Sequence, residues 1–324
     1  MKDAKPSGLR TAVVGVGYLG RFHAQKYATA AGSELVAVID ADFTAAERVA
    51  GELGTQALGD YRELLGKVDA VSIAVPTPLH FPIARDFLEA GAHVLVEKPI
   101  TTTIEQARSL IDIARRAQRV LQVGHLERFN PAIMALAGIL RTPRFIESHR
   151  LAPFKARGTD VSVVLDLMIH DIDLIQELVG APPEHIDAVG SSVFSGDIDI
   201  ANARLKFAGG CVANTTASRV SLKQERKIRI FQDDAYVSVD LQQKILTIVR
   251  KKESGPLESP AQVTIEERSF EQGDALLVEI ESFLTAAREG SPPVVTGEDG
   301  LRALATATQI AAQVTGAGAP LGLS

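Results

Sequence analysis

Apolar and polar positions follow two different patterns along this chain of 324 residues. Through residue 125, short apolar runs alternate with longer segments in which apolar residues recur every three or four positions. The runs predict buried strands and the longer segments predict helices. Strands are expected at 12–15, 34–40, 69–75, 93–96 and 120–123, and helices at 18–30, 44–53, 82–90 and 103–118, with a helical turn at 61–65. This alternation predicts a doubly wound parallel sheet with right-handed crossovers.

The second half of the chain has a different pattern. One strong helix pattern covers 161–179 and ends at Gly180. Short alternating segments follow at 201–207, 211–218, 227–231, 235–241 and 245–250, and helix patterns resume at 275–288 and 298–314. These segments predict an α+β domain with a mostly antiparallel, meander-like sheet. We therefore expect a first domain at 1–126 and a second at 127–324. Alternating apolar residues in 211–241 predict a sheet face left open for a partner.

A glycine motif lies directly between the first expected strand and the first expected helix. Gly15, Gly17 and Gly20 form G-x-G-x-x-G, and Asp40 follows twenty residues after the last glycine. A strand, a tight turn and a helix start would bring backbone N–H groups to a pyrophosphate, and the acid would meet a ribose. An ordinary glycine turn without a ligand would leave Asp40 unexplained. Ala41, rather than an arginine, follows the acid, which favours NAD over NADP.

Composition and charge narrow the classes of function. Hydrophobic residues make up 46% of the chain, the net charge is −6, and the isoelectric point is near 5.7. The acidic balance argues against a nucleic-acid or acidic-membrane partner, and no apolar run reaches the length of a membrane span. The basic start could pass for a secretory signal, but three glycines and then Arg21, His23 and Lys26 interrupt its apolar core. With one cysteine, Cys211, and no zinc-ligand spacing, we expect a cytoplasmic protein without a metal.

Two loops follow expected parallel strands, where ligands of such sheets bind. The first contains Pro76, Thr77 and His80, and its prolines fix a backbone that a flat ligand could approach. It is equally compatible with a rigid turn. The second is Glu97-Lys98-Pro99, from which the lysine would project at the end of a strand. A lysine in such a place is often only a solvated loop residue.

A polar cluster occurs within the long helix pattern of the second half. Asp166 and His170 are four residues apart and Asp173 is seven from Asp166, so an α-helix would present all three on one face. A carboxylate one turn from an imidazole can fix its tautomer and raise its basicity. The alternative is a structural Asp–His pair. Asp171 and Asp173 are expected to make packing or hydrogen-bonding contacts, and Arg128 either binds an anion or forms an ion pair between domains.

These motifs occur in one order, and together they resemble the Gfo/Idh/MocA family, named for glucose–fructose oxidoreductase, inositol dehydrogenase and rhizopine catabolism. The resemblance rests on G-x-G-x-x-G with Asp40, Thr77-Pro78-x-His80, Glu97-Lys98-Pro99, Arg128-Phe129-x-Pro131 and Asp166-x-x-x-His170. It covers essentially the whole chain. It implies an N-terminal Rossmann domain, a C-terminal domain with a large open sheet, and a dimer or tetramer formed through that sheet. It also implies catalytic roles for Lys98, Asp166 and His170.

A narrower resemblance concerns the substrate. Residues 123–131 and 153–173 are similar to the corresponding stretches of nucleotide-sugar members, notably UDP-N-acetylglucosamine 3-dehydrogenases. Arg150, Lys155 and Arg157 put positive charge just before an expected helix start, which suits a diphosphate. A solvated basic loop is the alternative explanation.

These observations predict reversible hydride transfer between a sugar carbinol carbon and nicotinamide. His170 would accept the hydroxyl proton, Asp166 would orient it, and Lys98 would stabilise the developing alkoxide. The residues expected at the cofactor are Gly15, Gly17, Tyr18, Leu19, Gly20, Asp40, Pro76, Thr77, His80, Glu97 and Lys98. Those expected at the substrate are Arg128, Asn130, Lys155, Arg157 and His170.

Three other functions stay open on the sequence alone. The first is a dehydrogenase of a free sugar or inositol. The second is a cofactor-sensing regulator without catalysis, although such a protein would need neither Lys98 nor the pair of Asp166 and His170. The third is an aldolase-like or dehydratase-like enzyme that uses NAD internally without net turnover.

Overall fold

The computed structural model describes residues 8–154, 162–252, 259, 262–271 and 273–316. By their contacts these residues form two compact units. The first comprises residues up to Leu126 together with Asp274–Leu301, and the second comprises Glu127–Gly273 and the residues from Arg302 onward. The sequence placed the boundary after residue 126 and gave everything beyond it to the second domain. The segment Asp274–Leu301 instead belongs to the first unit.

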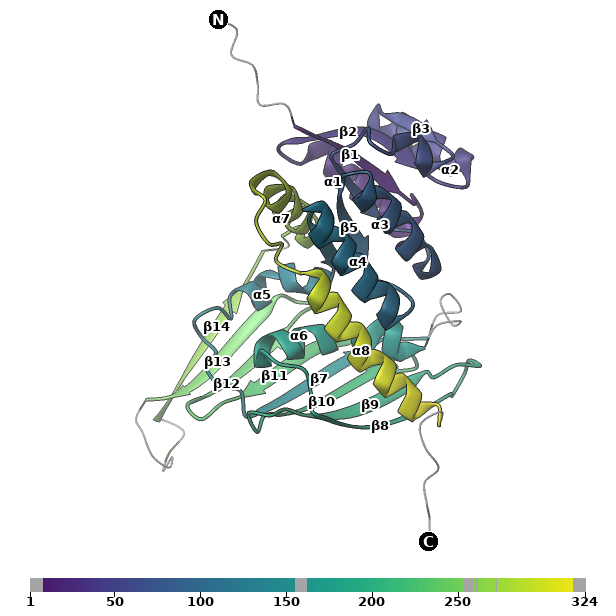
Figure 1. Ribbon diagram of the computed structural model, residues 1–324. Helices are drawn as coiled ribbons and strands as arrows, with labels where there is room; N and C mark the ends of the chain where they lie inside the picture. Colours follow the sequence, from purple (N-terminus) through teal and green to yellow (C-terminus); the bar gives the residue numbers. More distant parts are fainter. Residues whose placement is uncertain (1–7, 155–161, 253–258, 260–261, 272, 317–324) are drawn as a thin grey trace, which may run out of the picture. The chain divides into compact units, whose positions relative to one another are not determined.

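The first unit is built on a six-stranded parallel sheet in the order β3-β2-β1-β4-β5-β6 (Figure 1). Its strands are β1 (Leu9–Val14), β2 (Ser33–Ile39), β3 (Gln56–Leu58), β4 (Ala70–Ile73), β5 (His93–Glu97) and β6 (Leu121–Gly124). Its helices are α1 (Tyr18–Thr29), α2 (Phe43–Leu53), α3 (His80–Glu89), α4 (Ile104–Ala117) and α7 (Ala275–Glu289), with short turns η1 (Tyr61–Leu64) and η2 (Thr77–Leu79). This strand order is that of a dinucleotide-binding Rossmann fold, as predicted.

Local sequence explains where these helices begin and end. Asp42 caps α2 by accepting from the backbone N–H of Thr44 at 3.1 Å, and Gly54 ends that helix in the left-handed conformation. Thr103 caps α4 in the same way. The core of the unit joins Val13 and Leu95 of the sheet to Tyr27 of α1 and to Phe283 of α7. Helix α7 therefore fills the core of the first unit although it lies far along the chain.

The second unit is built on an eight-stranded sheet in the order β14-β13-β12-β11-β7-β10-β9-β8. Its strands are β7 (Phe145–Leu151), β8 (His185–Ser191), β9 (Ile200–Lys206), β10 (Val212–Ser218), β11 (Glu225–Phe231), β12 (Ala235–Asp240), β13 (Ile245–Lys251) and β14 (Val263–Ser269). All neighbouring strands pair antiparallel except β7 and β10, which are parallel. The helical segments are η3 (Leu126–Phe129), α5 (Pro131–Met134), η4 (Val164–Met168), α6 (Ile169–Val179) and the greater part of α8 (Gly297–Val314). The mostly antiparallel sheet is confirmed.

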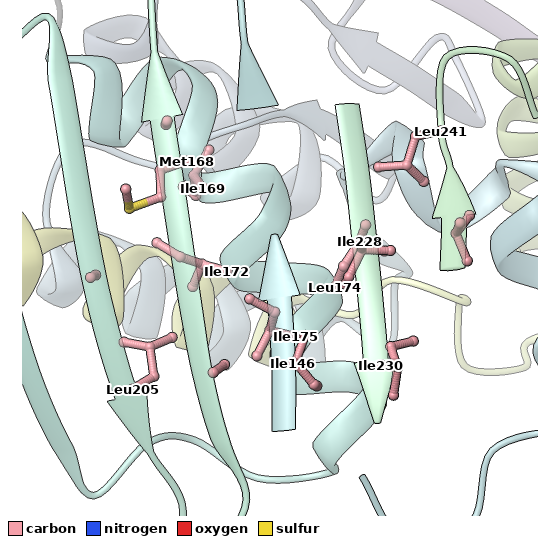
Figure 2. Packing of buried hydrophobic residues seen from close by; sticks show 14 of the residues in the cluster. Ile146, Met168, Ile169, Ile172, Leu174, Ile175, Leu205, Ile228, Ile230 and Leu241 are labelled. Atoms are coloured by element: carbon pink, nitrogen blue, oxygen red, sulfur yellow. The ribbon is translucent and has the colours of Figure 1, made fainter. Parts of the chain in front are cut away.

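The helices of the second unit cover one face of its sheet. Figure 2 shows Ile172 and Ile175 of α6 near Ile146 of β7 and Ile228 of β11, all members of one buried cluster. Ile310 of α8 belongs to the same cluster. Most of the alternating apolar residues of 211–241, such as Ile228, Ile230 and Val237, lie on this covered face, so they do not form the open apolar face that the sequence predicts. Residues on the other face of β11 include Lys227 and Arg229.

No helix among the described residues is long and apolar enough to cross a membrane. Within the same residues, no group of three or more His, Cys, Asp or Glu side chains could hold a metal ion.

Candidate active site

The turn between β1 and α1 needs glycine at two positions for reasons internal to the chain. Gly15 has φ +85°, and a Cβ there would lie 2.6 Å from the carbonyl oxygen of Ala74. A Cβ on Gly20 would lie 1.7 Å from the carbonyl oxygen of Gly15. Gly17 differs, because a Cβ there would meet no atom within 4 Å. Its lack of a side chain leaves space beside the backbone, as the approach of a pyrophosphate requires.

That space belongs to a cavity of about 610 Å³ at the carboxyl ends of β1, β2 and β4. Its walls include four residues that the sequence assigned to the cofactor, Gly15, Gly17, Asp40 and Pro76. Helix α1 begins at the cavity without a side-chain cap and with no acidic residue in its first turn. An uncapped helix start lined by glycine suits a phosphate group. The residues present therefore fit a dinucleotide.

Asp40 is held in place by the backbone. Its Oδ2 accepts from the N–H of Val16 at 2.8 Å, and its Oδ1 accepts from the N–H of Asp42 at 3.0 Å. The bond to Val16 ties the acid to the glycine turn itself, so the carboxylate and the pyrophosphate turn keep a fixed spacing. The carboxylate keeps acceptor capacity for the hydroxyls of a ribose.

Tyr61 and Arg62 are among the residues of the same cavity that sequence reasoning missed. The Arg62 guanidinium lies 4.8 Å from the centre of the Tyr61 ring and 3.3 Å from Asp60 Oδ1. Both follow β3, a strand of three residues that is too short to produce a detectable pattern. Ligands of parallel sheets bind beyond the carboxyl ends of the strands, so a sequence pattern that revealed β3 would also have pointed to these two residues.

The remaining residues assigned to the cofactor are not in the walls of this cavity. Tyr18 is 71% exposed on the first turn of α1, and Leu19 beside it is also exposed. His80 is buried, with Nδ1 2.9 Å from the Pro99 carbonyl oxygen and Nε2 2.9 Å from that of Val75. The ring thus fastens the loop after β4 to the loop after β5. Burial lowers the pKa of His80 against the raising effect of these carbonyl contacts.

The Glu97-Lys98-Pro99 segment divides its two charged side chains between different environments. The Glu97 carboxylate is mostly buried and lies 3.1 Å from His23 Nε2, so it faces the inside of the unit. Lys98 is half-buried just beyond the end of β5, and the Lys98–Pro99 peptide bond is cis. Thr77 is half-buried in η2. Lys98 belongs to the first unit, whereas Asp166 and His170 belong to the second.

Asp166 and His170 lie where a π-helical turn meets an α-helix. Asp166 is within η4, which has π-helical hydrogen bonding, and His170 is the second residue of α6. The sequence predicted one continuous α-helix over this region. A π-helical turn has more residues per turn, so the expected spacing on one face does not carry over unchanged. Such turns occur frequently at functional sites. Both residues are half-buried.

Arg128 and Asp173 form a buried ion pair inside the second unit. Arg128 Nε and Nη2 donate to Asp173 at 2.7 and 2.9 Å, and Arg128 Nη1 lies 2.8 Å from Glu177. Asp173 therefore makes hydrogen bonds, as expected, and its partner is Arg128. For Arg128 the sequence left open an anion or an ion pair between domains, and the ion pairs that it forms lie within its own unit.

Arg150 also forms buried ion pairs with carboxylates of the second unit. Its Nε donates to Asp171 Oδ2 at 2.7 Å and its Nη1 donates to Glu127 at 2.9 Å. Burial lowers the pKa of the guanidinium, but the charges of Asp171 and Glu127 outweigh it and raise that pKa. The sequence suggested that Arg150 binds a diphosphate. Because its charge is balanced by these two carboxylates, it has no free charge for that role. Asp171 is a structural partner, as predicted.

Of the other substrate or nucleophile candidates, Asn130 and Cys211 lie within the described residues. Asn130 caps α5 by accepting from the N–H of Ala132 at 3.1 Å, and it donates to the Leu241 carbonyl oxygen at 2.9 Å, so its amide serves the fold. Lys155 and Arg157 lie outside the described residues. Cys211 is buried, and burial raises the pKa of its thiol, which suits a packing role.

Residues 9–125 match the oxidoreductase family with an NAD-binding Rossmann fold, and residues 139–238 match the Gfo/Idh/MocA C-terminal domain. The chain belongs to the Gfo/Idh/MocA oxidoreductase family. One family member that it resembles is the UDP-N-acetylglucosamine 3-dehydrogenase of Acidithiobacillus ferrooxidans, with 44% identity over 93% of this chain and 96% of that one. The inositol 2-dehydrogenase of Rhizobium meliloti is 28% identical over 92% of this chain and 94% of its own length.

Solved structures agree with this membership. A structure of the Acidithiobacillus ferrooxidans enzyme superposes with a TM-score of 0.90 at 43% identity, covering 95% of this chain and 98% of that one. Levoglucosan dehydrogenase, in complex with NADH and levoglucosan, superposes with a TM-score of 0.84 at 19% identity, over 94% of this chain and 98% of its own. The second likeness shows a shared fold. As a Gfo/Idh/MocA member, the chain is an oxidoreductase.

Proposed function

We propose that this protein oxidises a hydroxyl group of a UDP-linked amino sugar to a ketone, with NAD as the oxidant. The substrate assignment rests on the near full-length, 44% identical match to a UDP-N-acetylglucosamine 3-dehydrogenase. The cofactor assignment rests on the cavity in which Gly17 leaves space beside the start of α1 and which Asp40 also lines. Bound NAD supplies the acceptor for the two electrons removed from the carbinol carbon.

The chain's own groups would hold the cofactor at three places. The turn at Gly15 and Gly17 and the uncapped start of α1 would bind the pyrophosphate through backbone N–H groups. The Asp40 carboxylate would accept hydrogen bonds from ribose hydroxyls. Its charge would repel a 2′-phosphate, so NAD is preferred to NADP. Arg62 lines the same cavity, but Asp60 already balances its charge.

Three side chains would serve catalysis. His170 accepts the proton of the substrate hydroxyl, and Asp166 orients the imidazole through the π-helical turn that connects them. Lys98 donates a hydrogen bond to the same substrate oxygen and stabilises the charge that develops on it. In the reverse direction His170 returns the proton to the oxygen. The substrate diphosphate would bind Lys155 and Arg157, since Arg128 and Arg150 are both occupied by carboxylates.

A calorimetric titration of UDP-N-acetylglucosamine into the NAD-saturated protein tests the substrate, with NADH absorbance followed in the same samples. Binding that UDP competes away, accompanied by NADH, is the expected result. Turnover of myo-inositol with no response to UDP would instead support the free-polyol function that the inositol 2-dehydrogenase likeness favours. Product formation without NADH would indicate internal use of NAD.

Lys98→Met tests the catalytic assignment. The substitution removes the ammonium group and keeps a flexible side chain of similar length. We expect kcat to fall by about a hundredfold or more, the range of losses seen when one group that stabilises a developing oxyanion is removed, with NAD affinity nearly intact. Turnover near that of the parent protein would refute the role of Lys98.

We also propose a homodimer or homotetramer formed through the outer face of the eight-stranded sheet. That face carries an aromatic group in which Phe231 lies 5.8 Å from Phe145 and 5.1 Å from Tyr236, measured between ring centres. Light scattering on the parent protein and on Tyr236→Lys tests the assembly. A parent protein that is a monomer, or a Tyr236→Lys mass equal to the parent's, would contradict it.

A further inference from the structure

A buried polar strip lies inside the first unit, beneath the segment that carries Lys98. Its members come from several elements of the Rossmann fold: His23, Tyr27, Ser72, Glu97, Gln122 and Glu279. His23, Tyr27, Ser72 and Glu279 are fully buried. Polar groups in such a place are costly unless they are hydrogen-bonded. The partners of each group therefore indicate its purpose.

His23 is the centre of this strip. It lies one turn into α1, three residues after Gly20. Its Nδ1 is 2.7 Å from Ser72 Oγ on β4, and its Nε2 is 3.1 Å from Glu97 Oε1 on β5. Since a carboxylate only accepts, the proton of this contact is on Nε2, and the Ser72 hydroxyl can satisfy Nδ1 in either protonation state of the ring. Both nitrogens are thus engaged, which fixes the ring.

Glu97 passes this constraint to Lys98. Its second carboxylate oxygen accepts the backbone N–H of Lys98 at 3.3 Å. Burial raises the pKa of Glu97, but the hydrogen bond and charge of His23, with the charge of Lys98, outweigh it and leave that pKa below its ordinary value. The group is therefore a carboxylate that bridges an imidazole and the backbone of the proposed catalytic residue.

The packing around Glu97 leaves it little freedom to move. A Cβ on Gly124, its register partner on β6, would lie 2.8 Å from Glu97 Oε1. On the other side of Lys98, the Pro99 carbonyl oxygen is held by His80. The backbone of Glu97-Lys98-Pro99 is thus fixed both before and after the lysine.

We propose that His23 and Glu97 are positioning residues, which hold Lys98 at the geometry that its reaction needs and fix it to the helix that starts at the pyrophosphate turn. The inference rests on the proposed function of Lys98. Buried ion pairs seldom stabilise a fold more than apolar residues of the same size, so a pair kept in this place is better explained by geometry than by stability. Fixed geometry matters because misplacing a catalytic group by about 1 Å can cost a hundredfold in rate.

The strip itself supplies a matched control. Glu279, on α7, is a second buried glutamate, and neither of its carboxyl oxygens has a hydrogen-bond partner among the described residues. Burial, reinforced by the charge of Glu97, raises the pKa of Glu279 well above its ordinary value, which favours the neutral form of this side chain. Glu97→Gln and Glu279→Gln are the same substitution at two positions of the same buried strip, although only Glu97→Gln removes a charge. Only the first touches the backbone of Lys98.

The experiment compares steady-state kinetics and melting temperature of the full-length variants with UDP-N-acetylglucosamine and NAD. Glu97→Gln should lower kcat by about tenfold or more while the two KM values change by less than about threefold. Glu279→Gln should leave kcat within about twofold. Equal losses of kcat in both variants would overturn the inference. So would a lower melting temperature for Glu97→Gln with kcat unchanged, because these buried groups would then serve the stability of the fold and not the position of Lys98.

A double variant separates this inference from the proposed function. If Glu97 acts through Lys98, then adding Glu97→Gln to Lys98→Met should cause no further loss of the residual kcat. A full additional tenfold loss would show that Glu97 acts independently of the lysine. Should Lys98→Met alone keep parental turnover, the proposed function fails first, whatever Glu97→Gln does.

Discussion

Gly20 packs so tightly against Gly15 that a methyl group on Gly20 would lie 1.7 Å from the Gly15 carbonyl oxygen. Gly17, between them, has open space where its methyl group would be. The three glycines of one motif are therefore required for different reasons. Two allow the chain to fold into the turn, and the third leaves space for what binds there.

This difference predicts that alanine at Gly20 lowers stability, whereas alanine at Gly17 weakens NAD binding. Gly20→Ala should reduce the free energy of unfolding by more than about 3 kcal/mol, because backbone must move to admit the methyl group. Gly17→Ala should leave that free energy nearly unchanged and weaken NAD binding by about tenfold or more, equivalent to about 1.4 kcal/mol. Urea unfolding and NAD calorimetry measure the two quantities. Parental NAD affinity in Gly17→Ala would remove the glycine turn from the cofactor site.

Asp40 should determine the choice between NAD and NADP. Because its carboxylate is fixed to the glycine turn through Val16, it cannot swing away from a 2′-phosphate. Asp40→Ala removes this repulsion and leaves Arg62 in the same cavity. We expect the ratio of kcat/KM for NAD over NADP to fall by at least about tenfold. Asp42→Ala, which removes only a helix cap, is the control and should leave the ratio unchanged.

Arg128 should support folding rather than substrate binding. Arg128→Met leaves the Asp173 carboxylate buried without its partner, and such losses cost about 3–5 kcal/mol of stability. The KM for the nucleotide sugar should change by less than about twofold in the protein that remains folded. Denaturant unfolding and steady-state kinetics test the two parts. A large rise in KM with unchanged stability would restore Arg128 to the substrate site.

Two of the strands that sequence patterns missed lack an apolar alternation, each for a physical reason of its own. Strand β7 is central in its sheet, yet its covered face includes Ser148 and Arg150, so no apolar alternation marks it. The arginine is tolerated there only because Asp171 and Glu127 meet it. Strand β14 is at the sheet edge and is exposed along nearly its whole length, so no side of it had to be apolar.

Only part of the candidate site could be predicted from the sequence. The glycine turn and Asp40 could be predicted because one strand–turn–helix unit brings them together. The roles of Arg128 and Arg150 could not, because their partners lie 45 and 21 residues away and only tertiary packing selects them. His23 is part of the helix that follows the glycine motif. Its partners on β4 and β5 become visible only once the parallel sheet is assembled.

His93 makes the stability of the first unit depend on pH. It is buried at the start of β5, and its Nδ1 accepts the N–H of Val120 at 3.0 Å, which requires an unprotonated nitrogen there. Burial, reinforced by the charge of Arg119, lowers the pKa of His93 to about 4. The unfolded chain would bind this proton near pH 6.5. Between these two values the unfolded state holds more protons, so stability falls as the pH falls.

His93→Gln should therefore flatten the pH dependence of unfolding. From pH 7 to pH 5 the proton linkage of His93 should cost the parent protein about 2 kcal/mol, which a residue without a titrating group does not lose. Urea unfolding at the two pH values measures the difference. His185→Gln removes an exposed histidine and should keep the parental slope. If His93→Gln loses as much stability between pH 7 and pH 5 as the parent protein does, then His93 is not the group that couples folding to protons in this range.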